Sequence, residues 1–391
     1  MRIALFTDTF PPVVNGVANA VARSARALAQ CGHEVCVFTV SDKSSGELER
    51  MANDAFRVVT LPSVGLPIYI DVRTSMPVGL ALGRVKKFRP DIIHSHTPFS
   101  VGWEAVWAAR ALGVPLVGTH HTFFNHYLEH VHLNYPWAET LSWKLTVAYY
   151  NRCNLVVSPT RSLASELLAH GLKRPYEILP NTIDTQLFRP EPDATARQKL
   201  KSTLGLPGPT LIYMGRVSYE KSIDQAIRAF ALIARDIPDA QFFIVGDGPG
   251  RAALEQLVST LGLGGRVRFL GFVFGQRLVE VLQASDVFVT ASKSENMPLA
   301  VLEAMACGLP VLAVRSLGLA EIIEDGRNGM LLPPDDTEAL AREAIALIKD
   351  DRLRVEQSRA SRTLSARYSE KEITRRLEGM YAAVVHRQKS L

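Results

Sequence analysis

Residues 294–303, Ser-Glu-Asn-Met-Pro-Leu-Ala-Val-Leu-Glu, contain two glutamates separated by seven residues. The apolar run at 286–290 before them predicts a strand, and the apolar run at 298–307 predicts a helix. A loop between a strand and a helix N-terminus presents unpaired backbone N–H groups and the positive end of the helix dipole to an anion. We therefore expect this junction to bind a phosphate. The residues expected to contact it are Asn296, Met297, Pro298 and Leu299.

The two glutamates suggest a more specific ligand. A carboxylate beside a phosphate repels it, so Glu295 is better suited to accept hydrogen bonds from sugar hydroxyls. Glu303, one to two helical turns later, could accept hydrogen bonds from a ribose. This division of roles indicates a nucleotide-sugar site. For this stretch taken alone, two solvated glutamates on an amphipathic helix remain the alternative.

Two further strand-to-helix turns precede this junction. The strand-like runs 210–214 and 242–245 each lead into a glycine-containing turn, where glycine lets the backbone turn sharply. Arg216 offers a planar fork of donors and Lys221 a compact charge, and both suit a diphosphate. A surface ion pair is the alternative role for these two cations. The residues of these turns expected to bind the donor are Gly215, Arg216, Lys221, Gly246 and Gly248.

With these motifs in order, the chain resembles the retaining glycosyltransferases of family 4. The N-terminal half is similar too: the strand at 2–7 leads into a loop bearing Gly16, although many members have two adjacent glycines where this chain has Asn15-Gly16. The resemblance implies an α/β GT-B fold, in which two Rossmann-like doubly wound domains face a central cleft. It also implies a UDP-sugar or GDP-sugar donor, no cofactor and no metal, with the nucleobase bound near Val273.

The resemblance implies that His121 lies near the transferred sugar, where it would hydrogen-bond a hydroxyl and shield developing charge. Arg216, Lys221 and Glu295 would complete the catalytic set. A purely structural histidine is the alternative. Seven of the ten histidines lie between His94 and His132, so a metal hydrolase also has to be considered. His126 and His130 have ligand-like spacing but lack the adjacent glutamate of an HExxH motif, and we expect no bound metal.

Strand and helix patterns alternate along the whole chain, which is typical of doubly wound parallel sheets. We expect an N-terminal domain over 1–180, a linker at 181–190, a C-terminal domain over 191–368 and a final helix at 369–391 that returns to the N-terminal domain. Predicted strands are 2–7, 34–40, 56–61, 91–96, 114–119, 154–158, 176–179, 210–214, 241–246, 267–271, 286–291, 310–314 and 329–332. Predicted N-terminal helices are 16–31, 75–89, 100–112, 137–152 and 161–170.

Composition is that of a globular protein, with 47% hydrophobic and 21% charged residues. No apolar run is long enough to cross a membrane, and the first residues form a strand pattern and not a secretory signal. The four cysteines have no ligand-like spacing and suggest reduced thiols in the cytoplasm. The net charge of +5 is modest, so we expect no nucleic-acid partner. The oligomeric state stays open.

The N-terminal domain, which we expect to take the acceptor, is rich in aromatic residues, with all four tryptophans between Trp103 and Trp143. Tryptophan and tyrosine favour membrane–water interfaces, and the basic run 84–89 would attract anionic headgroups. These features, and segments that resemble bacterial diacylglycerol glycosyltransferases, predict peripheral binding to the inner face of the cell membrane. A buried aromatic core is the alternative. The residues expected to contact acceptor or membrane are Phe123, Phe124, Tyr127, Trp137, Trp143, Lys86 and Lys87.

The sequence thus predicts transfer of a hexose or N-acetylhexosamine from a nucleotide sugar to a diacylglycerol or glycosyl-diacylglycerol lipid. A family 4 enzyme with a soluble or polysaccharide acceptor is the first alternative. A nucleotide-sugar epimerase or binding module of similar fold is the second.

Overall fold

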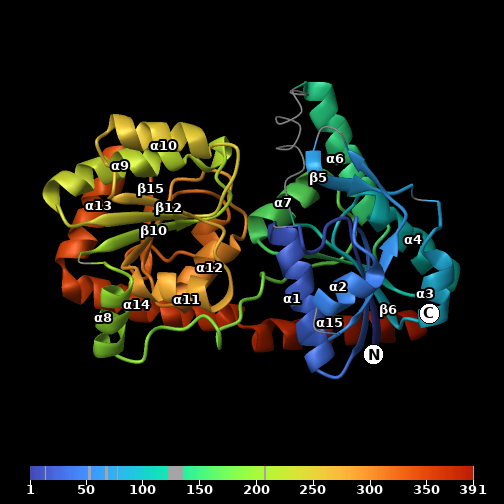
Figure 1. The fold of residues 1–391 in the computed structure, drawn as a ribbon. Helices are drawn as coiled ribbons and strands as arrows, with labels where there is room; N and C mark the ends of the chain where they lie inside the picture. Colours follow the sequence, from blue (N-terminus) through green and yellow to red (C-terminus); the bar gives the residue numbers. More distant parts are fainter. Residues whose placement is uncertain are drawn as a thin grey trace. The chain divides into compact units, whose positions relative to one another are not determined.

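The chain folds as two compact units, shown in Figure 1. The computed structural model describes residues 1–13, 15–51, 54–66, 69–76, 78–121, 135–206 and 208–390. Unit 1 comprises Met1–Thr182 and Glu370–Leu391, and unit 2 comprises Ile183–Ser369. Most of the predicted linker lies within unit 2, because Ile183 and Phe188 are part of its buried core.

Unit 1 contains a seven-stranded sheet in the order β3-β2-β1-β6-β7-β8-β9, with every adjacent pair parallel. The strands are β1 (Arg2–Thr7), β2 (Glu34–Val40), β3 (Arg57–Leu61), β6 (Ile92–Ser95), β7 (Leu116–Thr119), β8 (Leu155–Ser158) and β9 (Tyr176–Ile178). All seven were predicted. A separate antiparallel pair of strands, β4 (Val64–Leu66) and β5 (Tyr69–Thr74), was not among the predicted strands.

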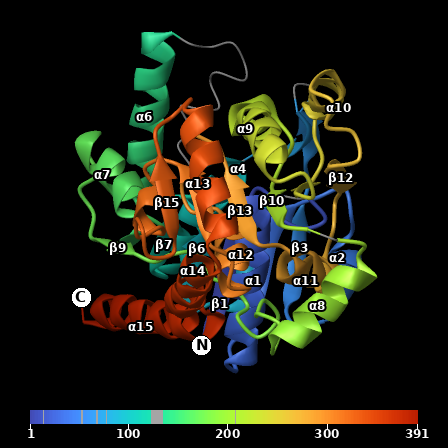
Figure 2. The ribbon, with the colours of Figure 1, turned by 90° about the vertical axis from the view of Figure 1, so that its left-hand side faces the viewer.

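Helices cover both faces of this sheet. They are α1 (Gly16–Gln30), α2 (Ser45–Met51), α3 (Leu82–Phe88), α4 (Ser100–Leu112), α6 (Pro136–Tyr150), α7 (Arg161–Ala169) and α15 (Glu370–Lys389). Alternate β1 residues face opposite layers: Leu5 packs in the cluster that contains α1 and α15, and Phe6 in the cluster that contains α4 and α6. Figures 1 and 2 both show α15 beside α1.

The helix predicted at 75–89 is shorter than expected, since α3 begins only at Leu82. Gly79 has a left-handed φ of 85°, which a continuous helix does not contain. The buried carboxylate of Glu104 on α4 accepts hydrogen bonds from the amides of Gly79 and Ala81, at 2.6 and 2.9 Å. These contacts hold the preceding residues in a turn.

Unit 2 contains a six-stranded parallel sheet in the order β12-β11-β10-β13-β14-β15. The strands are β10 (Thr210–Met214), β11 (Gln241–Val245), β12 (Val267–Gly271), β13 (Val287–Thr290), β14 (Val311–Val314) and β15 (Gly329–Leu332). The helices are α8 (Ala194–Thr203), α9 (Ile223–Asp236), α10 (Arg251–Thr260), α11 (Gly275–Ala284), α12 (Leu299–Ala306), α13 (Thr337–Lys349) and α14 (Asp351–Ser365). The core on one face includes α9 and α13, and the core on the other includes α11 and α12.

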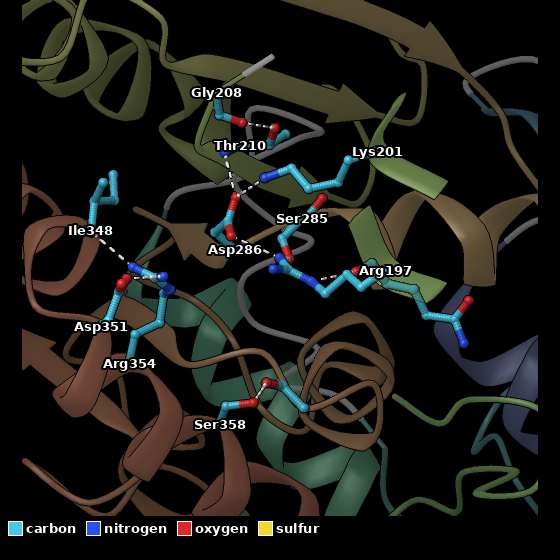
Figure 3. Close-up of polar contacts among 12 residues, drawn as sticks. Arg197, Lys201, Gly208, Thr210, Ser285, Asp286, Ile348, Asp351, Arg354 and Ser358 are labelled. Atoms are coloured by element: carbon cyan, nitrogen blue, oxygen red, sulfur yellow. Dashed lines mark hydrogen bonds and ion pairs between the residues drawn. The ribbon is translucent and has the colours of Figure 1, made fainter. Parts of the chain in front are cut away.

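A buried charge cluster attaches α8 to this sheet, as Figure 3 shows. The Asp286 carboxylate accepts from Arg197 at 2.7 Å, from Lys201 at 2.8 Å and from the backbone amide of Thr210 at 2.8 Å. Burial alone raises the pKa of Asp286, but the charges of Arg197 and Lys201 outweigh it, and the net pKa is lowered. The cluster sits where β10 and β13 begin, at the edge opposite the glycine turns that follow β10 and β11.

Replacement of this carboxylate should destabilise the protein. In Asp286→Asn two cations lose their counter-charge, and we expect a loss of about 3 kcal/mol in the free energy of unfolding. Because the folded pKa is lowered, the stabilisation is present above the unfolded value of about 3.9 and disappears as pH falls through the folded pKa. Urea unfolding at pH 7 and below pH 4 measures both effects. The control is Asp236→Asn, an exposed partner of Lys349, which should change stability by less than about 1 kcal/mol.

Candidate functional site

In unit 2 the first two glycine turns pack backbone against backbone. Gly246 has a φ of 125°, and a Cβ atom there would lie 1.9 Å from the carbonyl oxygen of Gly215. A Cβ on Gly248 would lie 2.4 Å from the carbonyl oxygen of Val217. The amide of Val217 donates to the carbonyl of Asp247 at 3.0 Å. Glycine is therefore required here to join the turns that follow β10 and β11.

The turn after β10 holds Arg216 with its guanidinium exposed. The buried Tyr213 hydroxyl donates to the Arg216 carbonyl at 3.1 Å, so the backbone beneath the side chain is held in place. Within the described ranges, the Arg216 side chain makes no ion pair. Its five donors therefore remain available to an anionic ligand.

Lys221 and Glu295 are brought together although 74 positions separate them in the chain. Lys221 Nζ lies 2.7 Å from Glu295 Oε1, and both side chains are largely buried. Lys221 comes from a short 3-10 helix, Tyr219–Lys221, and Glu295 from the loop before α12. Lys221, predicted to bind phosphate, and Glu295, predicted to bind the sugar, thus form one ion pair. A phosphate oxygen could replace Glu295 as the partner of Lys221, and a sugar hydroxyl could replace Lys221 as the partner of Glu295.

The loop before α12 is held by a close backbone contact with residues 316–318. A Cβ on Gly318 would lie 1.5 Å from the Asn296 carbonyl oxygen, and the Gly318 amide donates to the Glu295 carbonyl at 3.2 Å. The Met297 side chain is buried in the core, and Pro298 carries no N–H. The helical amides at this terminus begin at Leu299.

Both glutamates of the opening motif are sheltered from solvent. Glu303 is 6% exposed on α12, and the Glu295 side chain is 16% exposed. The alternative of two solvated glutamates on a surface helix is therefore wrong. The predicted nucleobase residue Val273 is half-buried against the core, and its chain neighbours Phe272 and Phe274 are exposed and stack on each other with ring centroids 6.0 Å apart.

In unit 1 Asn15 takes a structural role where many family members have a second glycine. Asn15 Oδ1 caps α1 by accepting from the Ala18 amide at 2.8 Å, and Asn15 Nδ2 donates to Thr9 Oγ1 at 2.8 Å. A Cβ on the neighbouring Gly16 would meet nothing within 4 Å. The loop is therefore open at Gly16 and anchored at Asn15.

Three histidines stack at the carboxyl ends of β6 and β7. The rings of His94 and His96 have centroids 4.1 Å apart, and those of His96 and His121 5.3 Å apart. His96 Nδ1 and His121 Nε2 lie within hydrogen-bond distance at 3.0 Å. The adjacent His120 packs instead against Trp143 and Tyr150. From the sequence, His94 and His96 were expected on one face of a strand end, where they could orient an acceptor. Their pairing with His121 was not predicted, because it depends on the register of two strands.

All three stacked histidines are uncharged at neutral pH. Burial lowers the pKa of His121 to about 4. Burial, with the neighbouring His121, lowers the pKa of His94 to about 3, and the pKa of His96 is also well below its usual value. Across the described residues, no three His, Cys, Asp or Glu side chains are grouped so as to hold a metal ion.

The predicted membrane residues separate into different environments. Trp137 is 63% exposed and forms a stripe on α6 with Leu141 and Leu145, at successive i, i+4 positions. Trp143, by contrast, is buried in the core and stacks on His170 at 4.0 Å, so it belongs to the core alternative. Lys86 and Lys87 are exposed on α3, on a different side of unit 1 from α6 (Figure 1).

The remaining aromatic residues of that prediction, Phe123, Phe124 and Tyr127, lie outside the described residues, as do His126, His130 and His132. In the part of the chain that the structure describes, we find no helix with the length and apolarity needed to span a bilayer.

Comparison with known proteins places this geometry in a family. Residues 196–364 match the model described as Glycosyl transferases group 1, and residues 14–187 match Glycosyltransferase Family 4. The alpha-monoglucosyldiacylglycerol synthase of Streptococcus pneumoniae is 30% identical over 85% of this chain and 75% of its own length. The D-inositol 3-phosphate glycosyltransferase of Saccharomonospora viridis is 33% identical over 74% of this chain and 69% of its own length.

The fold has close solved counterparts. The crystal structure of Anabaena Alr3699/HepE in complex with UDP superposes with a TM-score of 0.80 at 21% identity, and covers 98% of this chain and 100% of that one. Both units are Rossmann-like with parallel sheets, and a glycosyltransferase family model matches each half of the chain. The chain belongs to glycosyltransferase family 4 and is a glycosyltransferase with the GT-B fold.

Proposed function

We propose that the protein transfers a hexose or N-acetylhexosamine from a UDP-sugar or GDP-sugar to a membrane lipid of the diacylglycerol type, with retention and without a metal ion. The observation that carries the donor half is the Lys221–Glu295 pair, which joins the segment after β10 that also carries the exposed Arg216 to the loop before the α12 N-terminus. Two cations and helix amides suit a diphosphate, and the carboxylate suits sugar hydroxyls.

These groups would act mainly on the departing diphosphate. As the glycosidic bond to the nucleotide lengthens, negative charge develops on the phosphate oxygens, and preorganised donors stabilise it most. Arg216, Lys221 and the first amides of α12 supply such donors. Glu295 would exchange its ion pair for hydroxyls of the sugar.

His121 suits the opposite charge of the same transition state. The transferred sugar carries partial positive charge, which an imidazolium would repel. Because burial lowers the pKa of His121 to about 4, its ring stays neutral at pH 7 and can hydrogen-bond a sugar hydroxyl without that repulsion. No nucleophilic role is assigned to it.

Two observations support a lipid acceptor: the exposed face of α6 and the name of one relative. Trp137, Leu141 and Leu145 form an exposed apolar stripe with a basic residue, Lys144, beside it. Such a helix face can lie in a membrane interface. The S. pneumoniae relative is named for synthesis of a glucosyldiacylglycerol. The S. viridis relative, named for an inositol phosphate, keeps a soluble acceptor as the second candidate.

Two substitutions separate the roles within the donor site. Lys221→Met should weaken the binding of UDP and of UDP-glucose alike and lower kcat/KM about 10²-fold or more, because a cationic hydrogen-bond donor to the diphosphate is lost. Glu295→Gln should weaken the binding of UDP-glucose but leave the binding of UDP as tight or tighter. The substitution removes only a negative charge and a carboxylate oxygen that accepts hydrogen bonds from the sugar. Calorimetric titration with both ligands, repeated with GDP and GDP-mannose, measures this.

The matched control for the lysine is Lys293→Met, which breaks an exposed ion pair with Asp335. It should leave both affinities unchanged. If Glu295→Gln lost affinity for UDP and for UDP-glucose equally, the assignment of Glu295 to the sugar would be contradicted.

The acceptor is tested with liposomes that contain diacylglycerol and anionic lipid. Leu141→Glu with Leu145→Glu should reduce partitioning at least about tenfold, because two apolar side chains no longer enter the interface. Val355→Glu, at a similarly exposed position on α14 of unit 2, is the control and should partition normally. Flotation and transfer of radiolabelled sugar into extractable lipid are measured together. Wild-type protein that glycosylates inositol phosphate but not lipid would establish the soluble acceptor instead.

A further inference from the structure

The histidine stack of unit 1 is hydrogen-bonded to α15, the last helix of the chain. Tyr381 of α15 is fully buried, and its hydroxyl lies 2.6 Å from His94 Nδ1. The other nitrogen, His94 Nε2, lies 2.6 Å from Thr119 Oγ1 on β7. Tyr381 is 287 positions from His94, and the chain passes through all of unit 2 before it returns to make this contact.

The hydrogen bonds at the two nitrogens of His94 are complementary. A neutral imidazole carries one N–H, and the lowered pKa of His94 keeps the ring neutral. One ring nitrogen therefore donates and the other accepts, and the hydroxyls of Tyr381 and Thr119 take the opposite roles. The ring is held at both nitrogens, with a T-shaped contact to the tyrosine at 5.7 Å.

The position of the His94 ring also constrains His96 and, through it, His121, the histidine expected to contact the sugar. His96 stacks on His94 with an interplanar angle of 29°, and His96 shares a hydrogen bond with His121. A rotation of the His94 ring would displace the face against which His96 packs. Because one nitrogen of the His96–His121 pair donates to the other, the two rings also hold complementary tautomers.

We propose that Tyr381 is a positioning residue that, through His94 and His96, sets the orientation of the His121 ring. The inference rests on the proposed role of His121 in sugar transfer. It makes α15 part of the functional machinery of unit 1 and not merely a packing element, although Tyr381 itself touches neither substrate nor reacting atoms.

Tyr381→Phe tests the proposal because it keeps the ring and removes only the hydroxyl. We expect kcat for sugar transfer to fall about tenfold while KM for the nucleotide sugar stays unchanged, since donor affinity depends on unit 2 and the loss is one of alignment. The matched control, Tyr368→Phe, removes a buried hydroxyl from unit 2 and should preserve kcat.

A second readout needs no substrate. In protein labelled with 15N-histidine, ring-nitrogen resonances assigned from single histidine variants report each tautomer. Tyr381→Phe should shift the resonances of His96 and His121 as well as those of His94, whereas Tyr368→Phe should shift none. A change confined to His94, or a kcat equal to that of the control, would overturn the proposal.

Thr119→Val provides an independent route to the same ring, should Tyr381→Phe fold poorly. It removes the hydroxyl that is hydrogen-bonded to Nε2 and should shift the same resonances, while Thr119→Ser keeps the hydroxyl and should restore them. Absence of glycoside formation by the wild-type protein would refute the proposed function alone, because the resonances still decide whether the stack transmits the constraint.

Discussion

The donor half of the site depends on how closely its peptide backbones approach one another. Gly246 meets the Gly215 carbonyl, Gly248 meets the Val217 carbonyl and Gly318 meets the Asn296 carbonyl, each at a distance that leaves no room for a Cβ atom. These contacts pair the loop after β10 with the loop after β11 and, separately, the loop after β13 with the loop after β14. They hold the backbone on each side of the ion pair, in which Lys221 Nζ lies 2.7 Å from Glu295 Oε1.

Electrostatic roles are divided between the two units. In unit 2, charged groups lie where we propose that a diphosphate binds: Arg216 is exposed and Lys221 is paired with Glu295. In unit 1, burial removes charge, so the histidine stack is neutral. This contrast suits a reaction in which the leaving group becomes negative and the transferred sugar becomes positive. The buried Asp286 cluster, at the opposite edge of the unit 2 sheet, stabilises the fold without entering this chemistry.

Residues predicted as one surface proved to have different surroundings. Trp137 and Trp143 are six positions apart on α6, yet one is exposed and the other stacks on His170 in the core. Aromatic composition could not separate them, because an amphipathic helix places such residues on opposite faces according to the packing of its neighbours. The basic residues of α3 lie elsewhere on unit 1, so among the predicted membrane residues that the structure describes, Trp137, in the stripe on α6, supports the membrane interpretation.

The order of strands and helices, and the glycine turns after β10 and β11, could be predicted from the sequence, since periodicity and glycine are local signals. The sequence also contained both glutamates and His121. What required the tertiary structure were the partners: Lys221 for Glu295, His96 for His121 and Tyr381 for His94. Each pair joins segments that lie 25 or more positions apart, and no local pattern specifies which side chains meet when parallel strands set their register. The sequence alone therefore determined the class of fold and the residues available for chemistry, while the packed sheets decided which of them act together.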